Sequence, residues 1–527
     1  MAGSQPLSAP APRAMVRRQT SPAGPTLTFD ADFMPQRKRP FRSRDKSRSR
    51  SRSRKPNPNQ NRINKPETVR HAVFLLVEAH RIQKKLVRDL LTTMRIPDEL
   101  KPQAGAWAER LIVRRRTIDH ILKKCIARPA DQVQEQLWTL LQMGASELLF
   151  GPTDVQHAAI DETVELCRLL DHDNWTQFAN GVLRGVQRLM SEEVSDKPSA
   201  RAYPLTAKEY RVLQEDIFPD PAENLTQYAG IAFSLSDPIL REWSRRYEPD
   251  VLLTLCGATL RPAPMSVRVN RLAVEPEEWL KKCQTQGIEV TPTEFAGSYL
   301  IETRTRLSDL PGFAEGEFVV QDSTATMAAR MLNPYPGGRV LDLCAGPGTK
   351  TTQLAELMLD RGELVACEVA PHRIEQIEDN IRRLNLTCIQ THQIERNSPE
   401  IPGEPFEAIL VDAPCSNTGV LGKRPEARWR YSIPELHLLN ELQMQLLDSA
   451  ASYTTEDGRI VYSTCSIEPK ENEGLVTRWL EQHPEFRCTD MAHRLPDGQR
   501  DGGFCARLER IEVETDEETP PESTDGE

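Results

Sequence analysis

Apolar residues in the first part of the chain recur every three or four positions, which is the spacing of one buried face of an α-helix. The pattern occurs in five stretches, at residues 69–91, 108–126, 133–150, 157–170 and 175–190. Gly151-Pro152 separates the third stretch from the fourth, as expected where one helix ends and the next begins. We predict an all-helical module at residues 66–190, with many Lys and Arg on its polar faces.

The pattern changes after this module. Residues 191–250 contain several prolines and predict a connector with short helices. Apolar and polar residues then alternate at 265–274, as in a half-buried strand, and a helical pattern at 275–287 precedes a strand-like one at 288–295. These elements predict a small α/β subdomain at residues 251–332.

The last part of the chain alternates between strand and helix patterns. Four apolar, strand-like runs each end in small or polar residues, at 339–350, 363–370, 407–416 and 459–466. Helical patterns at 351–360 and 373–385 lie between them. Such alternation predicts an α/β domain at residues 333–510, with a mostly parallel sheet covered by helices on both faces. Ligands bind such sheets beyond the carboxyl ends of the strands, so we expect the four polar clusters to form one site.

The chain length and the distribution of charge predict a tail at each end of these domains. A chain of 527 residues exceeds what one hydrophobic core usually serves. Residues 1–65 hold 16 Lys and Arg against three Asp, a net charge of +13, so a total of −10 leaves −23 for the rest. We predict a disordered, basic, Arg-Ser-rich tail at 1–65, which is either simply solvated or a non-specific nucleic-acid arm. The acidic residues 511–527 predict a second disordered tail.

Cysteine usage and hydropathy indicate the compartment. The eleven cysteines form no CxxC pair and show no metal-ligand spacing with His, so we expect no metal and a reducing environment. No stretch approaches the roughly 18 apolar residues of a membrane span. The N-terminus has no apolar signal core, and its acid-poor composition favours disorder over a transit peptide. We therefore expect a soluble, cytoplasmic protein, without membrane association and monomeric.

A glycine-containing loop follows the first strand of the α/β domain and opens a helix. Its glycines allow backbone amides to approach a ligand closely, and a helix start favours a carboxylate or phosphate. The spacing matches neither a Walker loop nor GxGxxG. Glu368 ends the second strand, where an acidic side chain can hold both hydroxyls of a ribose. A plain tight turn is the alternative for the loop alone, and Glu368 favours a nucleotide-like ligand.

Two cysteines at strand ends indicate the reaction. Cys415 lies in DAPCS (412–416) and Cys465 in STCS (463–466). A buried cysteine is usually inert, and we accept that interpretation for most of the other nine. A thiolate, however, is a good carbon nucleophile. Its attack on carbon 6 of a pyrimidine makes carbon 5 able to accept a methyl group, and Asp412 can stabilise charge at ring nitrogen 3.

These motifs resemble those of a known family. DLCAGPGTKT (342–351), DAPCSNTG (412–419) and YSTCS (462–466) are similar to the motifs of the RsmB/Sun-type 16S ribosomal RNA (cytosine-5) methyltransferases. HAAIDETVEL (157–166) and FANGVLRGVQR (178–188) resemble the closing helices of NusB-like RNA-binding domains. The resemblance spans roughly residues 66–510. It implies a Rossmann-like methyltransferase domain preceded by a NusB-like domain and a small α/β RNA-binding subdomain.

The resemblance also implies roles for individual residues. Cys465 would be the nucleophile and Cys415 would help to release the methylated base, with Asp412 near both donor and base. S-adenosyl-L-methionine would be the donor, with Glu368 on its ribose. The remaining donor-binding residues would be Cys344, Ala345, Gly346, Pro347, Gly348, Thr349 and Lys350, with Asp412 beside them. Lys350, Arg424 and Arg428 would contact donor or RNA, the alternative for the two arginines being solvated charges.

The chain departs from the family pattern at three positions. Gly346 and Thr349 replace the usual Ala and Gly, a change the loop tolerates if Thr349 keeps a negative φ. Gln393 stands near the position where the family has an Asp that contacts adenosine, and could bind adenine instead. Neither departure removes the cysteines or Glu368, so we still expect an active enzyme.

The substrate is ribosomal RNA, most consistently 16S, on this interpretation. A transfer RNA cytosine-5 methyltransferase stays open, because the catalytic motifs do not encode the substrate. A non-catalytic RNA-binding ribosome-assembly factor would result if the altered loop abolished donor binding. The Arg-Ser repeats suggest a nuclear interaction protein, but the enzyme motifs outweigh them. A DNA methyltransferase is disfavoured by the second, Thr-Cys motif.

Overall fold

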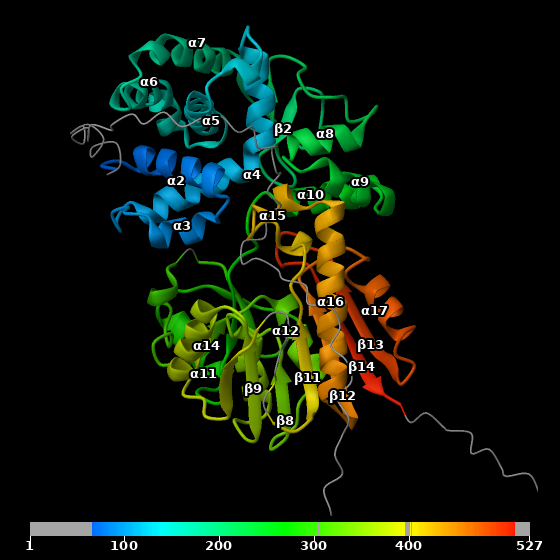
Figure 1. Ribbon diagram of the computed structural model, residues 1–527. Coiled ribbons are helices and arrows are strands. Elements are labelled where there is room, and N and C mark those ends of the chain that lie inside the picture. The colour runs from blue at the N-terminus through cyan, green and yellow to red at the C-terminus, as the bar shows by residue number, and fades with distance from the viewer. Residues whose placement is uncertain (1–65, 304, 396–400, 402, 512–527) are drawn as a thin grey trace, which may run out of the picture.

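The computed structural model describes residues 66–303, 305–395, 401 and 403–511 (Figure 1). The basic tail predicted at 1–65 lies outside the described residues, and so does the acidic tail predicted at 511–527, apart from Ile511. None of the described helices combines the length and the apolar character needed to cross a membrane.

The N-terminal module is all-helical, as predicted. Its α-helices are α2 (Val69–Gln83), α3 (Val87–Thr93), α4 (Lys101–Cys125), α5 (Glu135–Phe150), α6 (Thr153–Leu169) and α7 (Asp173–Leu189), with a 3-10 turn η1 (Ala130–Gln132). The Thr68 side chain caps α2 by accepting the N–H of His71. The predicted break at Gly151-Pro152 separates α5 from α6. Apolar side chains from α2, α4, α5, α6 and α7 form one core.

Residues 190–260 form more than the predicted connector. They begin with a three-stranded antiparallel sheet of order β1-β3-β2, made of β1 (Met190–Ser195), β2 (Ala202–Pro204) and β3 (Tyr210–Leu213). The short helices follow as α8 (Leu225–Ala232), α9 (Asp237–Arg246) and α10 (Pro249–Ala258). The buried Tyr203 donates its hydroxyl to Leu149 O of α5, at 3.0 Å. This segment therefore shares the core of the helical module.

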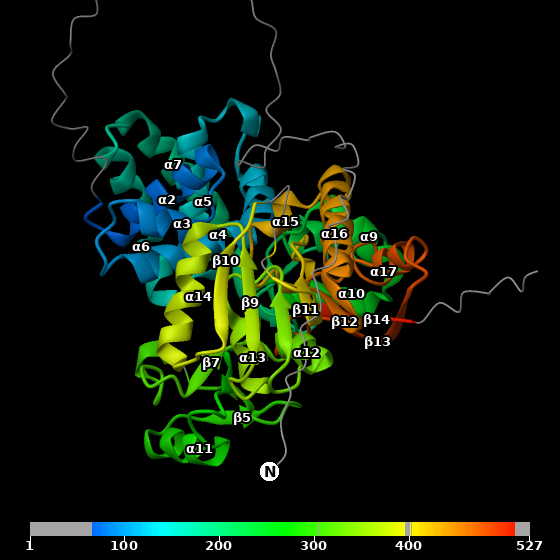
Figure 2. The ribbon, with the colours of Figure 1, turned by 60° about the horizontal axis from the view of Figure 1, so that its bottom comes forward.

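A small antiparallel sheet of order β5-β6-β4-β7 comes next. Its elements are β4 (Ser266–Val269), α11 (Pro276–Thr285), β5 (Val290–Pro292), β6 (Ser298–Ile301), the 3-10 turn η2 (Leu307–Asp309) and β7 (Phe318–Val320). Trp279 of α11 is fully buried and packs against Tyr299 and Phe318, which closes a separate core under the sheet. Figure 2 shows α11 at the end of the molecule opposite α7.

The C-terminal domain has a seven-stranded sheet of order β10-β9-β8-β11-β12-β14-β13. Its strands are β8 (Arg339–Asp342), β9 (Glu363–Glu368), β10 (Ile389–Gln393), β11 (Phe406–Asp412), β12 (Thr454–Thr464), β13 (Phe486–Arg494) and β14 (Gly503–Arg510). The first five in this order are parallel, and β14 and β13 are antiparallel to their neighbours. The predicted mostly parallel sheet is thus confirmed.

Helices cover both faces of this sheet, which explains its buried strands. They are α12 (Ser323–Leu332), α13 (Thr349–Leu357), α14 (Pro371–Leu384), α16 (Ile433–Tyr453) and α17 (Glu473–Leu480). The short helix α15 (Ala427–Arg430) packs instead against the helical module, and a 3-10 turn η3 (Thr418–Val420) precedes it. Successive residues of β8 serve opposite cores, because side chains alternate along a strand: Val340 lies in one and Leu341 in the other. The carboxyl ends of β8, β9, β11 and β12 consequently meet at one edge.

The helical module lies against this edge in Figure 1, and Arg428 joins the two parts. Its guanidinium has no exposed surface and donates to Val113 O (3.1 Å), Thr259 O (2.7 Å) and three further carbonyls, those of Ser234, Leu421 and Pro425. Burial lowers the pKa of Arg428 to about 9. The prediction that Arg428 contacts donor or RNA, or is a solvated charge, is wrong: five buried carbonyls take up its donors.

Candidate active site

A loop between β8 and α13 lines the main cavity of the described residues. Gly348 has φ +99° and precedes α13, a conformation that favours glycine. Thr349 starts the helix without a positive φ, so its replacement of glycine causes no strain. A Cβ on Gly346 would clash with Glu368 Oε2, so an alanine there would displace this carboxylate. Glycine at 346 therefore suits the neighbours present in this chain.

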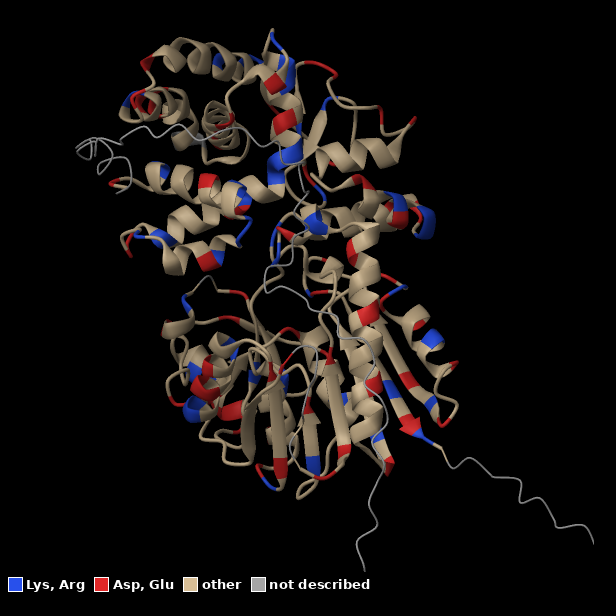
Figure 3. Ribbon diagram, viewed as in Figure 1, with Lys and Arg blue, Asp and Glu red and all other residues tan. Residues whose placement is uncertain are grey.

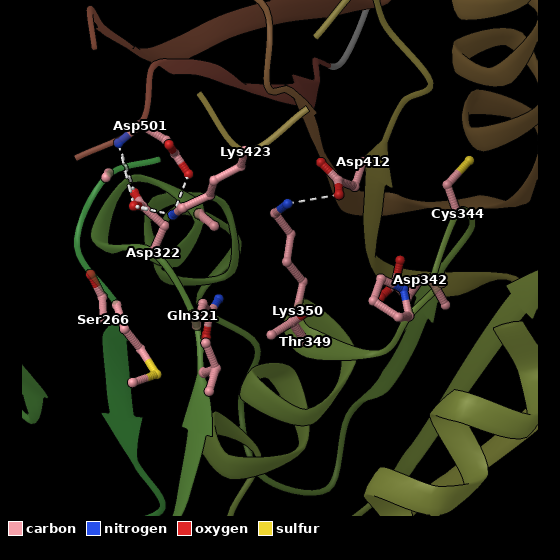
Figure 4. Close-up of a pocket in the computed structure, with 17 residues that line it drawn as sticks. Ser266, Gln321, Asp322, Asp342, Cys344, Thr349, Lys350, Asp412, Lys423 and Asp501 are labelled. Atoms are coloured by element: carbon pink, nitrogen blue, oxygen red, sulfur yellow. Dashed lines mark hydrogen bonds and ion pairs between the residues drawn. The ribbon is translucent and has the colours of Figure 1, made fainter. Parts of the chain in front are cut away.

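The cavity encloses about 440 Å³ between this loop, the small sheet and the ends of β8 and β11 (Figure 4). Of the predicted donor-binding residues, those that line it are Cys344, Ala345, Gly346, Pro347, Thr349, Lys350 and Asp412. Gly348 and Glu368 lie outside the lining. The other polar lining residues carry no role in the predicted site, and they are Ser266, Gln321, Asp322, Asp342, Lys423 and Asp501.

Asp342 offers an unused acceptor to this cavity. One carboxylate oxygen accepts the hydroxyl of Thr351 at 2.7 Å, and the other, Oδ1, is buried without a hydrogen-bond partner among the described residues. Burial, opposed by the Thr351 hydrogen bond, raises the pKa of Asp342 to about 7. A buried acceptor left unpaired costs free energy, and a ligand cation would satisfy it. The residues present thus fit a donor that carries an ammonium group, with Asp342 as its acceptor.

Donor affinity is expected to fall as the pH decreases through about 7. The ionised Asp342 attracts the ammonium group, and because its pKa is raised, protonation removes this attraction within the physiological range. The dissociation constant should rise by up to about tenfold per pH unit between pH 7.5 and 6, measured by titration calorimetry with S-adenosylmethionine. Asp342→Asn should bind more weakly with a flat profile. A flat profile for the wild type would contradict the role of Asp342.

Glu368 lies behind the loop at the end of β9. Its Oε1 accepts the N–H groups of Val369 (2.8 Å) and Ala370 (3.0 Å), and its Oε2 accepts the N–H of Gly346 (3.2 Å). Gln393 is the parallel partner of Glu368 on β10 and is exposed. Both side chains therefore stand at the carboxyl ends of neighbouring parallel strands, and their roles toward ribose and adenine stay predictions.

Lys350 and Asp412 form an ion pair between the loop and β11. Lys350 Nζ lies 2.7 Å from Asp412 Oδ2, and Ser463 of the adjacent β12 donates to Asp412 Oδ1 at 2.8 Å. Desolvation lowers the pKa of Lys350, but the charge of Asp412 and its hydrogen bond outweigh it and leave the pKa raised. The amine therefore stays protonated, which places a proton donor beside the Asp412 carboxylate.

The two predicted cysteines are brought together. Their sulfur atoms are 3.2 Å apart, and Cys465 Sγ lies 3.3 Å from Asn417 Oδ1, which also accepts a hydrogen bond from Arg424 at 2.8 Å. The hydrogen bond from Cys415 lowers the pKa of Cys465 against the effect of burial, and Arg424 and Lys350 lower it further. The same hydrogen bond and burial raise the pKa of Cys415. The pair thus favours a thiolate on Cys465 and a thiol on Cys415.

A second, smaller cavity of about 50 Å³ contains Cys465. It shares Asp322, Ala325, Lys350 and Asp501 with the main cavity, so the two adjoin. Lys423 forms ion pairs with Asp322 and Asp501 at 3.1 and 2.7 Å (Figure 4), and these two carboxylates line both cavities. The cysteine pair, a carboxylate–amine pair and a nucleotide-sized cavity are therefore gathered at one edge of the sheet.

Comparison with known proteins agrees with this arrangement. Residues 329–507 match the 16S rRNA methyltransferase RsmB/F family, 67–188 the NusB family and 239–303 the ferredoxin-like domain of RsmF/B-like methyltransferases. The chain is 30% identical over 402 residues to the ribosomal RNA small subunit methyltransferase B of Klebsiella pneumoniae (strain 342), covering 74% of this chain and 86% of that protein. This chain belongs to the RsmB/F methyltransferase family.

Two further comparisons extend the RsmB/F assignment. The probable ribosomal RNA small subunit methyltransferase B of Bacillus subtilis (strain 168) is 29% identical over 388 residues, which cover 73% of this chain and 80% of that protein. The crystal structure of PH0851 superposes with a TM-score of 0.65 at 23% identity and covers 84% of this chain and 99% of that one, which supports the fold. The chain is an S-adenosylmethionine-dependent RNA methyltransferase of this family.

Proposed function

We propose that this RsmB/F-family enzyme methylates carbon 5 of a cytosine in small-subunit ribosomal RNA, with Cys465 as the nucleophile on carbon 6. The observation that carries the proposal is the cysteine pair, with its sulfur atoms 3.2 Å apart and the pKa of Cys465 lowered beside the donor cavity. Methylation of an exocyclic amine or of a ribose would need no thiolate there.

The chemistry divides among the side chains of the site. The Cys465 thiolate adds to carbon 6, and Asp412 stabilises the charge that develops at ring nitrogen 3 through the proton it shares with Lys350. When bound, S-adenosylmethionine supplies an electrophilic methyl group. The proton on carbon 5 then passes to water, the electron pair of that C–H bond restores the ring double bond, and the bond from carbon 6 to Cys465 breaks to release the thiolate. We assign to the Cys415 thiol the hydrogen bond that stabilises the departing Cys465 sulfur.

Substrate RNA fits the domain composition. The NusB-like module and the ferredoxin-like subdomain belong to matched families, and Figure 3 shows Lys and Arg on the helical module beside Asp and Glu. A target base that is stacked in the RNA would be extruded to reach Cys465. The monomeric state and the cytoplasmic location stay predictions.

The direct test uses the purified full-length protein with methyl-labelled S-adenosylmethionine and unmodified small-subunit RNA. We expect label in 5-methylcytidine after nuclease digestion and mass spectrometry. A parallel reaction with transfer RNA tests the alternative substrate. Label in transfer RNA alone would show that the substrate assignment is wrong while the assigned reaction is right. Donor binding without transfer to either RNA would favour the RNA-binding assembly factor and contradict the enzyme.

Cys415→Ala is expected to trap the covalent complex with RNA. Cys415 assists addition only through the hydrogen bond that lowers the pKa of Cys465, whereas release depends on it more strongly. Turnover should therefore fall by about 100-fold while a denaturant-stable protein–RNA band accumulates. Gel electrophoresis after incubation with donor and RNA measures the band. Cys125→Ala, a half-buried thiol in the helical module, serves as the control and should leave both readouts unchanged. Absence of the band would contradict the role of Cys415.

A further inference from the structure

The residue after each of the two cysteines binds the same buried carboxylate. Ser416 donates its N–H to Glu471 Oε1 at 2.8 Å and its hydroxyl to Oε2, and Ser466 donates its hydroxyl to Oε2 at 2.6 Å. The amide of Gln443, from α16, donates to Oε1 at 3.1 Å. Glu471 thus connects the loop after β11 to the loop after β12.

Glu471 is fully buried, and none of the described Lys, Arg or His side chains forms an ion pair with it. A buried carboxylate without a cation is costly, and here hydrogen bonds from neutral groups compensate it. Its own backbone is also fixed, because its N–H donates to Glu468 O at 2.9 Å and its carbonyl accepts the hydroxyl of Tyr462 at 2.7 Å. An apolar side chain at this position would leave the buried donors of Ser416, Ser466 and Gln443 without their acceptor, so the carboxylate is what connects the two loops.

Its neighbours give the site a specific geometry. The two serine hydroxyls lie 3.2 Å apart, as do the two cysteine sulfurs beside them. Asn472, the next residue, donates to Ser466 O at 2.9 Å and accepts the hydroxyl of Thr464 at 2.6 Å. The backbone on both sides of Cys465 is therefore held from one short segment.

We propose that Glu471 is a positioning residue for both cysteines: its carboxylate holds Ser416 and Ser466 so that the two sulfurs stay in contact, and its negative charge keeps the shared proton on Cys415. The inference rests on the proposed role of Cys465 as nucleophile. It adds a residue that touches neither base nor donor and that contributes to which of the two thiols ionises.

The charged side chains on the two sides of the cysteine pair favour the same ionisation state. Glu471 faces Cys415 and raises its pKa, in addition to the larger effects of the Cys465 hydrogen bond and burial. Arg424 and Lys350 face Cys465 and lower its pKa, while Asp412 opposes them. Negative charge on the Cys415 side and positive charge on the Cys465 side together place the thiolate on Cys465.

The test compares Glu471→Gln with Glu473→Gln, a nearby carboxylate that contacts neither serine, in the full-length chain. Alkylation of each cysteine by iodoacetamide is followed from pH 5.5 to 10 by peptide mass spectrometry, without donor or RNA. In the wild type and in Glu473→Gln we expect Cys465 to react at a lower pH than Cys415. In Glu471→Gln the two midpoints should converge, and kcat should fall by about 100-fold with KM little changed.

Glu471→Asp distinguishes the effect of the carboxylate charge from the effect of binding both serines. It also provides a second test if the glutamine variant does not fold. It keeps the charge but is one methylene too short to bind both serines, so Cys465 should keep its lower midpoint while kcat falls. Unchanged profiles and unchanged kcat in both folded variants would overturn the inference. If instead Cys465 showed no lower midpoint than Cys415 in the wild type, the proposed nucleophile itself would be wrong.

Discussion

Replacing Cys465 with serine is expected to abolish methyl transfer, lowering kcat/KM by at least about 10⁴-fold. The thiolate at this position is stabilised by the hydrogen bond from Cys415 and by Arg424 and Lys350. A serine hydroxyl is nearly isosteric, but it ionises far above physiological pH and the same neighbours cannot make it an effective carbon nucleophile. Steady-state transfer of labelled methyl groups to RNA measures the loss, and no covalent band should form even when Cys415 is also replaced.

Cys505→Ser is the matched control for this experiment. Cys505 lies on β14 and also lines the smaller cavity, but burial raises its pKa to about 12, so it stays a thiol. Its replacement should change the rate by less than about tenfold, and titration calorimetry should show unchanged donor binding in both variants. Retained transfer in Cys465→Ser, with loss in Cys415→Ser, would reverse the assigned roles of the two active-site cysteines.

The methyltransferase domain was predictable because its signals are local. Each parallel strand is an apolar run that ends in polar or small residues, and the topology of such sheets places those ends together. The same rule predicts from the sequence alone that Asp412, Cys415 and Cys465 lie together, because each lies at or just after the carboxyl end of a parallel strand. The antiparallel pair β13 and β14 was not predicted, since half-exposed strands such as β13 alternate too weakly to be recognised.

The sheet formed by β1, β2 and β3 was missed for a related reason. β1 has the sequence MSEEVS and no buried residue, so its strand conformation comes from pairing with β3 rather than from its own pattern. The prolines and short elements of residues 191–250 therefore led to the prediction of a connector. Tyr203 and Tyr228 are buried by tertiary contacts with the helical module, and a local sequence pattern does not reveal such contacts.

The environments of side chains whose partners are distant in the sequence could not be predicted either. Lys423 gains its environment from Asp322 and Asp501, which reach it from separate loops. Arg428 is buried because carbonyls of the helical module and of α10's C-terminal end converge on it. Glu471 follows the second cysteine motif by only a few residues, yet its role depends on Ser416, which a linear motif does not connect to it.

Asp412→Asn is expected to reduce methyl transfer by about 10³-fold. Asp412 accepts hydrogen bonds from Lys350 and Ser463 at the junction of the two cavities, and only a carboxyl group can share the Lys350 proton with a ring nitrogen as charge develops there. The asparagine keeps the shape and loses the charge. Ser463→Ala removes a single hydrogen bond to Asp412 and should cost less than about tenfold.

The effect of the Asp412 charge on the pKa of Cys465 lets this variant distinguish two roles for Asp412. The charge of Asp412 raises the pKa of Cys465, so removing it should leave the thiolate as available as before, or more so. Alkylation of Cys465 should therefore proceed at or below its wild-type midpoint while transfer to RNA falls, and donor affinity measured by calorimetry separates a binding defect. Loss of transfer together with a raised Cys465 midpoint would contradict the assignment, because Asp412 would then act on the thiol and not on the pyrimidine ring.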